Sequence, residues 1–191
     1  PNCEIFGNMD TLRRIGGLVG YLKNSMLDNS SADIPVVAAS NEVGGLVGAM
    51  EESKVNQSSS HRSVQGVSKI GGLVGIVLGG YKESSILNSY HLSDNVSGNS
   101  NIGGLVGSIG NNFTSTTITV QPTNLVENSY AASSVVNGTT QNIGGLVGYK
   151  AGTSSNVFVI NSYYDSTISG QVDNSGKGTP ATTAQLQQTQ D

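Results

Sequence analysis

The chain has 191 residues, a length that suits one domain. Only 12% of the residues are charged and the formal net charge is −4, so the sequence offers no basic patch of the kind that binds nucleic acid. The single cysteine, Cys3, excludes an intrachain disulfide and any zinc site built from several cysteines.

Residues 1–14 come before the motif that organises the rest of the chain. They begin at Pro1 without a signal peptide, so we interpret the sequence as a piece of a longer polypeptide with flanking domains. No stretch approaches about 18 continuous apolar residues, and no membrane insertion is expected of this segment. Because Met9 stands before Gly16 much as a valine stands before the later glycine pairs, residues 1–14 are interpreted as an incomplete first repeat.

The organising motif is the quintet Gly-Gly-Leu-Val-Gly, whose copies begin at Gly16, Gly44, Gly71, Gly103 and Gly144. A stretch of variable length leads from each quintet to a second landmark, an asparagine: Asn29, Asn56, Asn88, Asn128 and Asn161. The distance from each asparagine to the next quintet is nearly constant, and a valine recurs within it, at Val37, Val64, Val96 and Val136. A fixed part and a part that tolerates insertion indicate a packed coil with a surface loop.

Short strands are expected in every repeat, because Val, Ile, Thr and Tyr alternate with turn-forming residues. If Ile-Gly-Gly-Leu-Val-Gly forms one strand, both of its faces are apolar and both should be buried. We predict that the five leucines of the quintets stack on one another in the core: Leu18, Leu46, Leu73, Leu105 and Leu146. The recurrent valines are expected to be core residues as well. The valine beside each leucine is expected to lie beneath a loop, a neighbouring sheet or a partner chain.

The landmark asparagines allow two interpretations. In register, their amides would form a ladder from coil to coil, as in cross-β stacks. Alternatively they occupy turns, because Asn tolerates the left-handed conformation. If each asparagine lies within one continuous strand, alternation places Ile86 on the same face as Tyr90.

The repeat pattern stops after Gly170, and residues 171–191 are polar. Thr182 or Thr183 is expected to cap a short helix through Gln188, although a frayed terminus or a linker fits this segment as well. The sequence therefore predicts an all-β fold. Residues 1–170 form a parallel, right-handed β-solenoid of about five coils, and residues 171–191 form a C-terminal cap or linker.

The quintet, the following loop, the aliphatic-Asn-Ser-Tyr segment and the Val-x-Gly segment resemble the GLUG repeat over about residues 9–170. Residues 161–171 with 182–186 are similar to the segment that often closes such arrays. The resemblance implies a repeat module of a large bacterial surface or secreted protein, such as a filamentous-haemagglutinin-like adhesin or an IgA-cleaving metallopeptidase. It implies no reaction.

Motifs of catalysis are missing from the sequence. His-Glu-x-x-His, Gly-x-Ser-x-Gly and a phosphate-binding glycine loop do not occur, and the acidic residues are scattered. His61 and His91 are expected on the surface without a catalytic or metal-binding role. No cofactor is predicted. Ca²⁺ is the weaker alternative, with Asp94, Asn95, Asp165 and Asp173 as candidate oxygen ligands, but they match no known calcium loop.

We predict a non-catalytic module of an adhesin on a bacterial cell surface or secreted, presenting variable loops to a host protein or glycan. The loops at residues 107–124 and 149–156 hold the candidate contact residues Phe113, Thr114 and Tyr149. The alternative is an accessory or spacer domain of a secreted IgA-type metallopeptidase. A zinc-binding motif elsewhere in the full polypeptide would favour that alternative.

Overall fold

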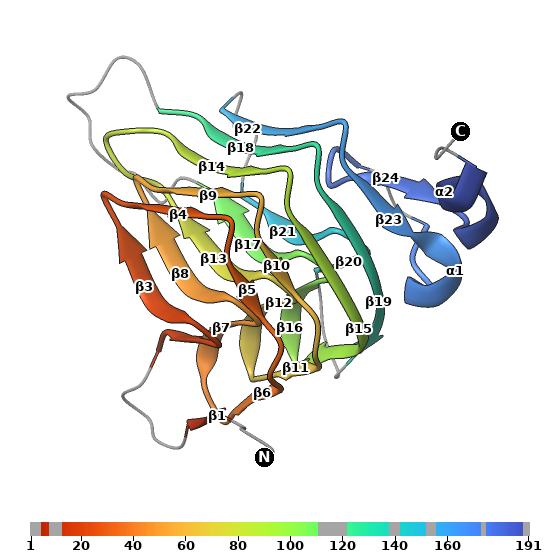
Figure 1. Cartoon of the computed structure of the whole chain (residues 1–191), viewed down its shortest axis with the longest axis horizontal. Coiled ribbons are helices and arrows are strands. Elements are labelled where there is room, and N and C mark those ends of the chain that lie inside the picture. Colours follow the sequence, from red (N-terminus) through yellow and green to blue (C-terminus); the bar gives the residue numbers. More distant parts are fainter. Residues whose placement is uncertain are drawn as a thin grey trace.

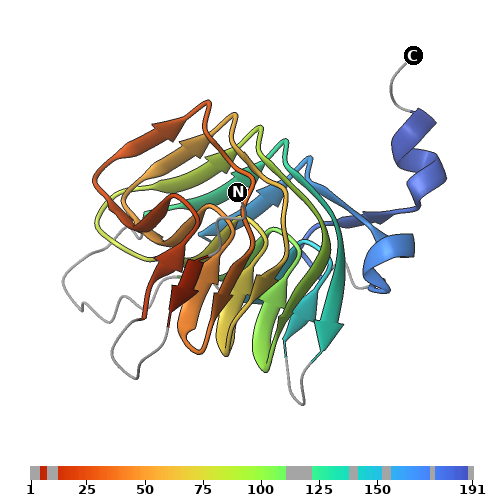
Figure 2. The same ribbon diagram turned by 60° about the horizontal axis from the view of Figure 1, so that its bottom comes forward.

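The computed structural model describes residues 5–7, 13–110, 122–137, 142–151, 156–172 and 175–188. They form an all-β parallel solenoid whose coils lie side by side, with two short helices beyond the last coil (Figures 1 and 2). Three of its four sheets contain five strands each, so the stack has five coils. The four sheets are called A, B, C and D and are described below. Along the chain, each complete coil contributes strands first to sheet B, then to C, to D and finally to A.

Sheet B consists of β2 (Ile15–Gly16), β7 (Asn41–Gly44), β12 (Ser68–Gly71), β16 (Ser100–Gly103) and β20 (Ile143–Gly144). Sheet C consists of β3 (Val19–Lys23), β8 (Val47–Glu51), β13 (Val74–Leu78), β17 (Val106–Gly110) and β21 (Val147–Lys150). Sheet D consists of β4 (Met26–Asp28), β9 (Lys54–Asn56), β14 (Ser84–Leu87), β18 (Asn124–Glu127) and β22 (Val157–Ile160).

Sheet A is the longest and closes each coil. It consists of β1 (Ile5–Gly7), β5 (Ser31–Ala32), β6 (Val36–Ala38), β10 (Ser59–Ser60), β11 (Val64–Gln65), β15 (Tyr90–Gly98), β19 (Tyr130–Asn137), β23 (Tyr163–Asp165) and β24 (Thr179–Ala181). The incomplete first repeat supplies β1, and Ile5 is the residue that pairs with Val36. Met9, which the sequence spacing proposed for this alignment, lies outside the described residues.

The quintet forms a corner between two sheets, which corrects the expectation of one continuous strand. A strand of sheet B ends at the first glycine, the chain bends through the second glycine and the leucine, and a strand of sheet C begins at the valine. The bend turns leucine and valine into the same core, so Val47 is as fully buried as Leu46. The valine therefore needs no separate cover.

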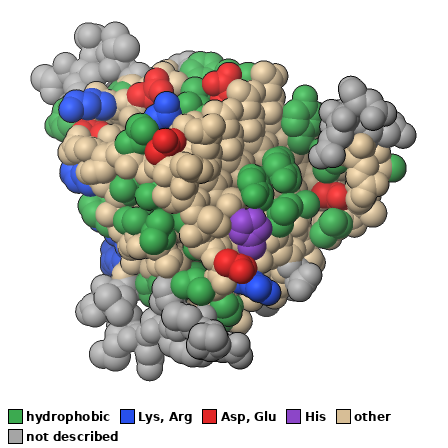
Figure 3. Space-filling view, viewed as in Figure 1, with side chains coloured by type: hydrophobic (Ala, Val, Ile, Leu, Met, Phe, Trp, Pro, Cys, Tyr) green, Lys and Arg blue, Asp and Glu red, His purple; other side chains and the backbone are tan. Residues whose placement is uncertain are grey.

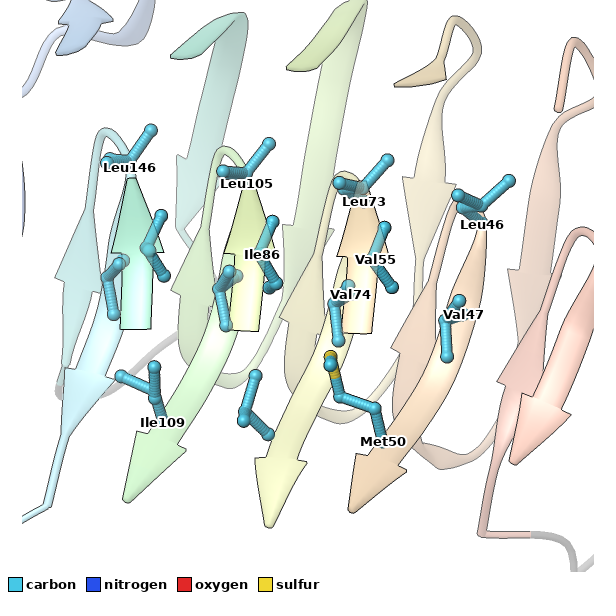
Figure 4. Close-up of a cluster of buried hydrophobic side chains, with 14 of the residues drawn as sticks. Leu46, Val47, Met50, Val55, Leu73, Val74, Ile86, Leu105, Ile109 and Leu146 are labelled. Atoms are coloured by element: carbon cyan, nitrogen blue, oxygen red, sulfur yellow. The ribbon is translucent and has the colours of Figure 1, made fainter. Parts of the chain in front are cut away.

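Four of the predicted core leucines line one buried cluster in a row along the stack (Figure 4): Leu46, Leu73, Leu105 and Leu146. Leu18 is the exception, because 52% of its surface is exposed. It belongs to the first coil, where no described residue covers it from the outer side. The prediction of a core position for Leu18 is therefore wrong.

A second buried cluster lies between sheet B and the end of each sheet A strand. Val36, Val64 and Val96 are fully buried there, and Val135 is almost fully buried. Val36 and Val135 are one residue earlier than the predicted Val37 and Val136. For Val135 the cause is a bulge of β15 relative to β19 between Ser93 and Val96. For Val36 the cause is that the second coil turns at Gln57 and not at Asn56, so Val64 is one residue closer to its turn than the sequence spacing suggested. Val37 is half-buried and aligns with Gln65 instead. The constant spacing in the sequence hid this change of register.

The landmark asparagines lie at corners in the left-handed conformation, between sheets D and A. The positive-φ residues at this position are Asn29, Gln57, Asn88, Asn128 and Asn161. Gln57 corrects the predicted landmark of the second coil, because Asn56 pairs with Asp28 in the strand before the corner. The corner also separates Ile86, which is buried in the core, from Tyr90 on the outer face, so the two do not share a face.

The amide ladder is present as well, over part of the stack. Asn128 Nδ2 donates to Asn88 Oδ1 (3.4 Å), and Asn88 Nδ2 donates to Asn56 Oδ1 (3.0 Å). Asn56 Nδ2 then donates to Asp28 Oδ1 (2.6 Å). The turn and the ladder thus coexist at Asn88 and Asn128, which are left-handed corner residues, and the ladder continues through Asn56 and Asp28 in the strands before their corners.

Replacing Asn88 should separate these two contributions. Alanine at this corner is expected to lower the free energy of unfolding by about 2 kcal/mol, through left-handed strain and the loss of amide bonds. Asn88→Gly tolerates the conformation and should lose only about 1 kcal/mol. Urea denaturation followed by circular dichroism measures both values. Equal losses in the two variants would contradict a role for the left-handed backbone.

The serine after each corner forms a buried ladder that sequence reasoning missed. Its hydroxyl donates to the carbonyl two residues earlier and accepts from the backbone N–H of the matching serine in the preceding coil, as for Ser89 with Leu87 O (2.6 Å) and Ser58 N (3.1 Å). The same pattern holds along the ladder for Ser58, Ser89, Ser129 and Ser162. The recurrent Asn-Ser pair in the sequence was the available signal.

The C-terminal segment folds back onto the last coil. Helix α1 (Ser166–Ser169) follows β23, β24 adds to sheet A, and α2 (Thr183–Gln188) ends the described chain. Thr182 begins α2, since its hydroxyl accepts from Gln185 N (3.2 Å) and Gln185 Oε1 accepts from Thr182 N (2.8 Å). The predicted helix and its cap are present.

Candidate binding surface

Three tyrosines form a row on the outer face of sheet A, which we call the tyrosine stripe: Tyr90, Tyr130 and Tyr163. Tyr90 pairs with Tyr130 and Tyr130 with Tyr163 across neighbouring strands. Strands alternate their side chains, so the residues that follow these tyrosines point into the core: His91, Ala131 and Tyr164. The recurrent Asn-Ser-Tyr sequence therefore repeats one outward aromatic ring in successive coils.

The rings of the stripe contact one another directly. Tyr90 and Tyr130 stack with ring centroids 5.1 Å apart and ring planes 10° from parallel. His61 continues the row toward the N-terminal end and contacts Tyr90 edge-to-face, with ring centroids 5.4 Å apart. Its Nε2 lies 3.3 Å from the Tyr90 hydroxyl. The space-filling view shows apolar side chains gathered beside a histidine on this face (Figure 3).

The C-terminal helices turn the end of the stripe into a groove, which we call the cap groove. It has a volume of about 520 Å³ and is lined by Tyr130, Ala132, Tyr163, Asp165, Ile168, Thr183, Leu186 and Gln187. Tyr130, Tyr163 and Ile168 each expose between 38% and 45% of their surface. Such apolar exposure beside a concave groove is typical of a ligand-binding surface.

The groove carries little usable charge. Asp165 is 2% exposed, and its Oδ1 accepts from Thr167 N (2.9 Å) and Ile168 N (3.0 Å) at the start of α1. Its Oδ2 accepts from Thr183 Oγ1 (2.7 Å), which ties α2 to α1. Burial, and then the neighbouring Tyr90, raise the pKa of Tyr130, so its hydroxyl remains a hydrogen-bond donor. The surface thus offers rings, hydroxyls and amides rather than ions.

The candidate contact residues from the sequence lie elsewhere. Phe113 and Thr114 lie outside the described residues. Tyr149 is on β21 in sheet C, pairs with Ser108 of β17 and is 38% exposed. The structure therefore does not bring Tyr149 to the tyrosine stripe, which sequence reasoning did not single out as a surface.

His91 is fully buried, which corrects its predicted surface position. Its Nδ1 lies 2.9 Å from Ser60 Oγ and its Nε2 lies 3.0 Å from Ser93 Oγ. The pKa of His91 is lowered from 6.5 to about 3, chiefly by burial and to a smaller extent by the nearby His61, while a hydrogen bond to Ser60 opposes the shift. The imidazole is thus a neutral core group without access to a substrate.

Two of the proposed calcium ligands, Asn95 and Asp165, have described side chains. Asp165 uses both carboxylate oxygens within the cap, and Asn95 lies at the bulge of β15. The side chain of Asp94 and all of Asp173 lie outside the described residues. In the described part of the chain, no three His, Cys, Asp or Glu side chains gather where they could hold a metal ion.

Neither described helix is long and apolar enough to cross a membrane.

Comparison with known proteins gives one partial match. A stretch of 61 residues, 32% of this chain, is 49% identical to a "Putative Gly-rich membrane protein" of Evansella cellulosilytica. That stretch covers only 7% of the length of the relative. No model of a known protein family matches the chain, and no solved structure matches it significantly. The chain is therefore similar to a small part of one large glycine-rich protein.

Proposed function

We propose that this chain is a non-catalytic binding module of a secreted or cell-surface bacterial protein, and that its tyrosine stripe and cap groove bind a neutral glycan. The observation that supports the proposal is the row of half-exposed tyrosines ending in a groove with almost no usable charge. The resemblance of the repeats to GLUG arrays supports a place in a large surface or adhesive protein.

The chemistry of the surface fits a sugar better than a charged ligand. A pyranose ring combines apolar C–H patches with a rim of hydroxyls, and so needs aromatic surface next to uncharged hydrogen-bonding groups. Tyr130, Tyr163 and Ile168 supply the first, and Thr183 and Gln187 supply the second. Next to His61 in the chain, Arg62 forms an ion pair with Asp33 (2.7 Å).

Removing the stripe should remove binding. Tyr130→Ala and Tyr163→Ala are each expected to weaken binding to a neutral glycan, identified on a glycan array, by about 10-fold or more, since each deletes a desolvated aromatic contact. Titration calorimetry measures the affinities, and circular dichroism verifies the fold.

Tyr149→Ala is the matched control, because Tyr149 has the same exposed fraction as Tyr130, 38%, but lies on sheet C. It should bind as the unmodified chain does. A Phe113→Ser, Thr114→Ala double variant tests the loop prediction. Loss of binding in that variant or in Tyr149→Ala, with Tyr130→Ala and Tyr163→Ala unaffected, would assign the site to the loops instead.

A further inference from the structure

A second groove lies beside the cap groove, and we call it the distal groove. It has a volume of about 430 Å³ and is lined by Tyr163, Pro180, Ala181, Gln185 and Leu186. Tyr163 and Leu186 line the cap groove as well, so the two grooves meet at these side chains. None of the residues that line the distal groove is charged. The uncharged surface of the tyrosine stripe therefore continues past Tyr163.

The two grooves follow one another across the strands of sheet A. The cap groove has lining residues on β19 and β23, and the distal groove has lining residues on β23 and β24. These strands are neighbours in that order, and Tyr130 pairs with Tyr163 as Tyr163 pairs with Thr179. Figure 1 shows β24 beside β23 at this end of the stack, leading into α2. A ligand that enters both grooves thus lies along the stack, in line with the tyrosine stripe.

The spacing of this surface suits a chain of sugar rings. Neighbouring strands lie about 4.8 Å apart, and the stacked rings of Tyr90 and Tyr130 have centroids 5.1 Å apart. A pyranose unit in an extended chain advances by a similar length, so each strand can meet one unit. The steps from β15 to β19, β23 and β24 add up to about 14 Å. A single sugar ring would leave most of this surface unused.

Gln185 places a hydrogen-bond donor in the distal groove. Its Oε1 accepts from Thr182 N (2.8 Å) and from Thr182 Oγ1 (3.1 Å), which fixes the plane of the amide. The Nε2 of the same amide meets no acceptor among the described residues, and the side chain is exposed. Because the amide is already held through Oε1, a ligand oxygen that accepts from Nε2 has little side-chain freedom to remove.

We propose that the ligand of this surface is an extended, linear, neutral glycan of at least three units, which runs along the tyrosine stripe, crosses Tyr163 and continues into the distal groove. The inference rests on the proposed function and adds the class of glycan and a further contact residue. Gln185 Nε2 donates to an oxygen of the unit in the distal groove. Tyr163 lines both grooves, so it contacts two consecutive units.

Chain length is the first test. The probes are β-1,4-linked oligosaccharides of glucose, mannose, xylose and N-acetylglucosamine, each from one to four units long, and titration calorimetry measures their affinities for the folded chain. At least one series should bind, and its trisaccharide should bind about 10-fold or more tightly than its monosaccharide, because only the longer chain fills both grooves. Equal affinity at all lengths, or no binding in any series, would overturn the inference.

Gln185→Glu is the variant that isolates the distal groove. Its carboxylate keeps an oxygen for Thr182 N and Thr182 Oγ1, so the start of α2 is preserved while the Nε2 donor is lost. The affinity for the trisaccharide and the tetrasaccharide should fall by about 10-fold, and the affinity for the monosaccharide should not change. Gln187→Glu is the matched control, because it makes the same change on the same helix but lines the cap groove. It should weaken binding at every length.

The variants also separate this inference from the proposed function. If Tyr130→Ala weakens glycan binding but Gln185→Glu affects all lengths equally or none, the ligand does not enter the distal groove. In that case the inference is wrong and the proposed function stands. If Tyr130→Ala leaves the binding of the tetrasaccharide unchanged, both are wrong.

Discussion

Gly103→Ala is expected to lower the free energy of unfolding by about 3 kcal/mol or more, a large effect for a single methyl group. A Cβ at residue 103 would lie 2.6 Å from Gly148 N and 2.8 Å from Leu146 O, and closer still to Val106 O. All three neighbours are backbone atoms, so no side chain can rotate away to make room. The corner formed by the quintet and the coil after it would have to move.

The effect should extend beyond one coil, because the first glycine in each of the first four quintets makes the same contact with the next coil. At Gly71, a Cβ would lie 2.7 Å from Gly107 N, which is the equivalent contact one coil earlier in the stack. Contacts between neighbouring coils provide most of the stability of a solenoid. A displaced quintet corner therefore weakens the interfaces of its coil with both the coil before and the coil after it. Thermal unfolding followed by circular dichroism should show a melting temperature roughly 10 °C lower.

Gly80→Ala is the matched control, since it also adds one methyl group to a glycine. The neighbours of a Cβ there are atoms of the flexible Glu52 side chain, 2.5 Å and more away, which can move aside at the cost of the hydrogen bond from Tyr81 N to Glu52 Oε1 (2.6 Å). The free energy of unfolding should therefore fall by only about 1 kcal/mol. If the Gly103→Ala chain is as stable as the Gly80→Ala chain, the backbone around the first glycine of the quintet has room for a side chain, and the prediction is wrong.

The stacking of coils could be predicted from the sequence because it depends on repetition alone. Equal quintets placed in equal coils pair in register, as Gly71 does with Gly103. The turn at the landmark asparagines was one of the two interpretations of the sequence, because Asn tolerates the left-handed conformation. The corner within each quintet could not be found in the same way, since strand alternation gives no sign of where a chain bends. Left-handed residues at the recurrent position within sheet B include Glu42 and Lys69, residue types that do not announce a turn.

The tyrosine stripe was partly predictable and the cap groove was not. Asn-Ser-Tyr recurs in the sequence, and a corner at the asparagine places each tyrosine outside, as the structure shows for Tyr130. The groove requires α2 to fold back over β23, which depends on the contact of Asp165 with Thr183. A contact between residues in different segments leaves no periodic signal in the sequence.

The burial of His91 also lacked a sequence signal, because the matching inward residues of other coils are Ser60 and Ala131. Its consequence is a dependence of stability on pH. The pKa is about 3 in the folded chain and about 6.5 when unfolded, so between these values the unfolded chain binds a proton that the folded chain excludes. Stability should therefore fall as the pH decreases from 7 toward 3.

At pH 5 the expected loss relative to pH 7 is about 2 kcal/mol, the cost of keeping this imidazole neutral about 1.5 pH units below its unfolded pKa. His91→Ser should remove that slope, because serine occupies the same place in the coil before it. His61→Ser should retain the slope, as His61 lies on the outer side of the coil beside Tyr90. Urea denaturation of the three chains at pH 7, 6 and 5 measures the free energy of unfolding of each. Subtracting the values of a variant from those of the unmodified chain removes the contribution of the acid-sensitive groups that both chains share. Parallel pH curves for the unmodified chain and His91→Ser would show that the buried imidazole takes up its proton without penalty.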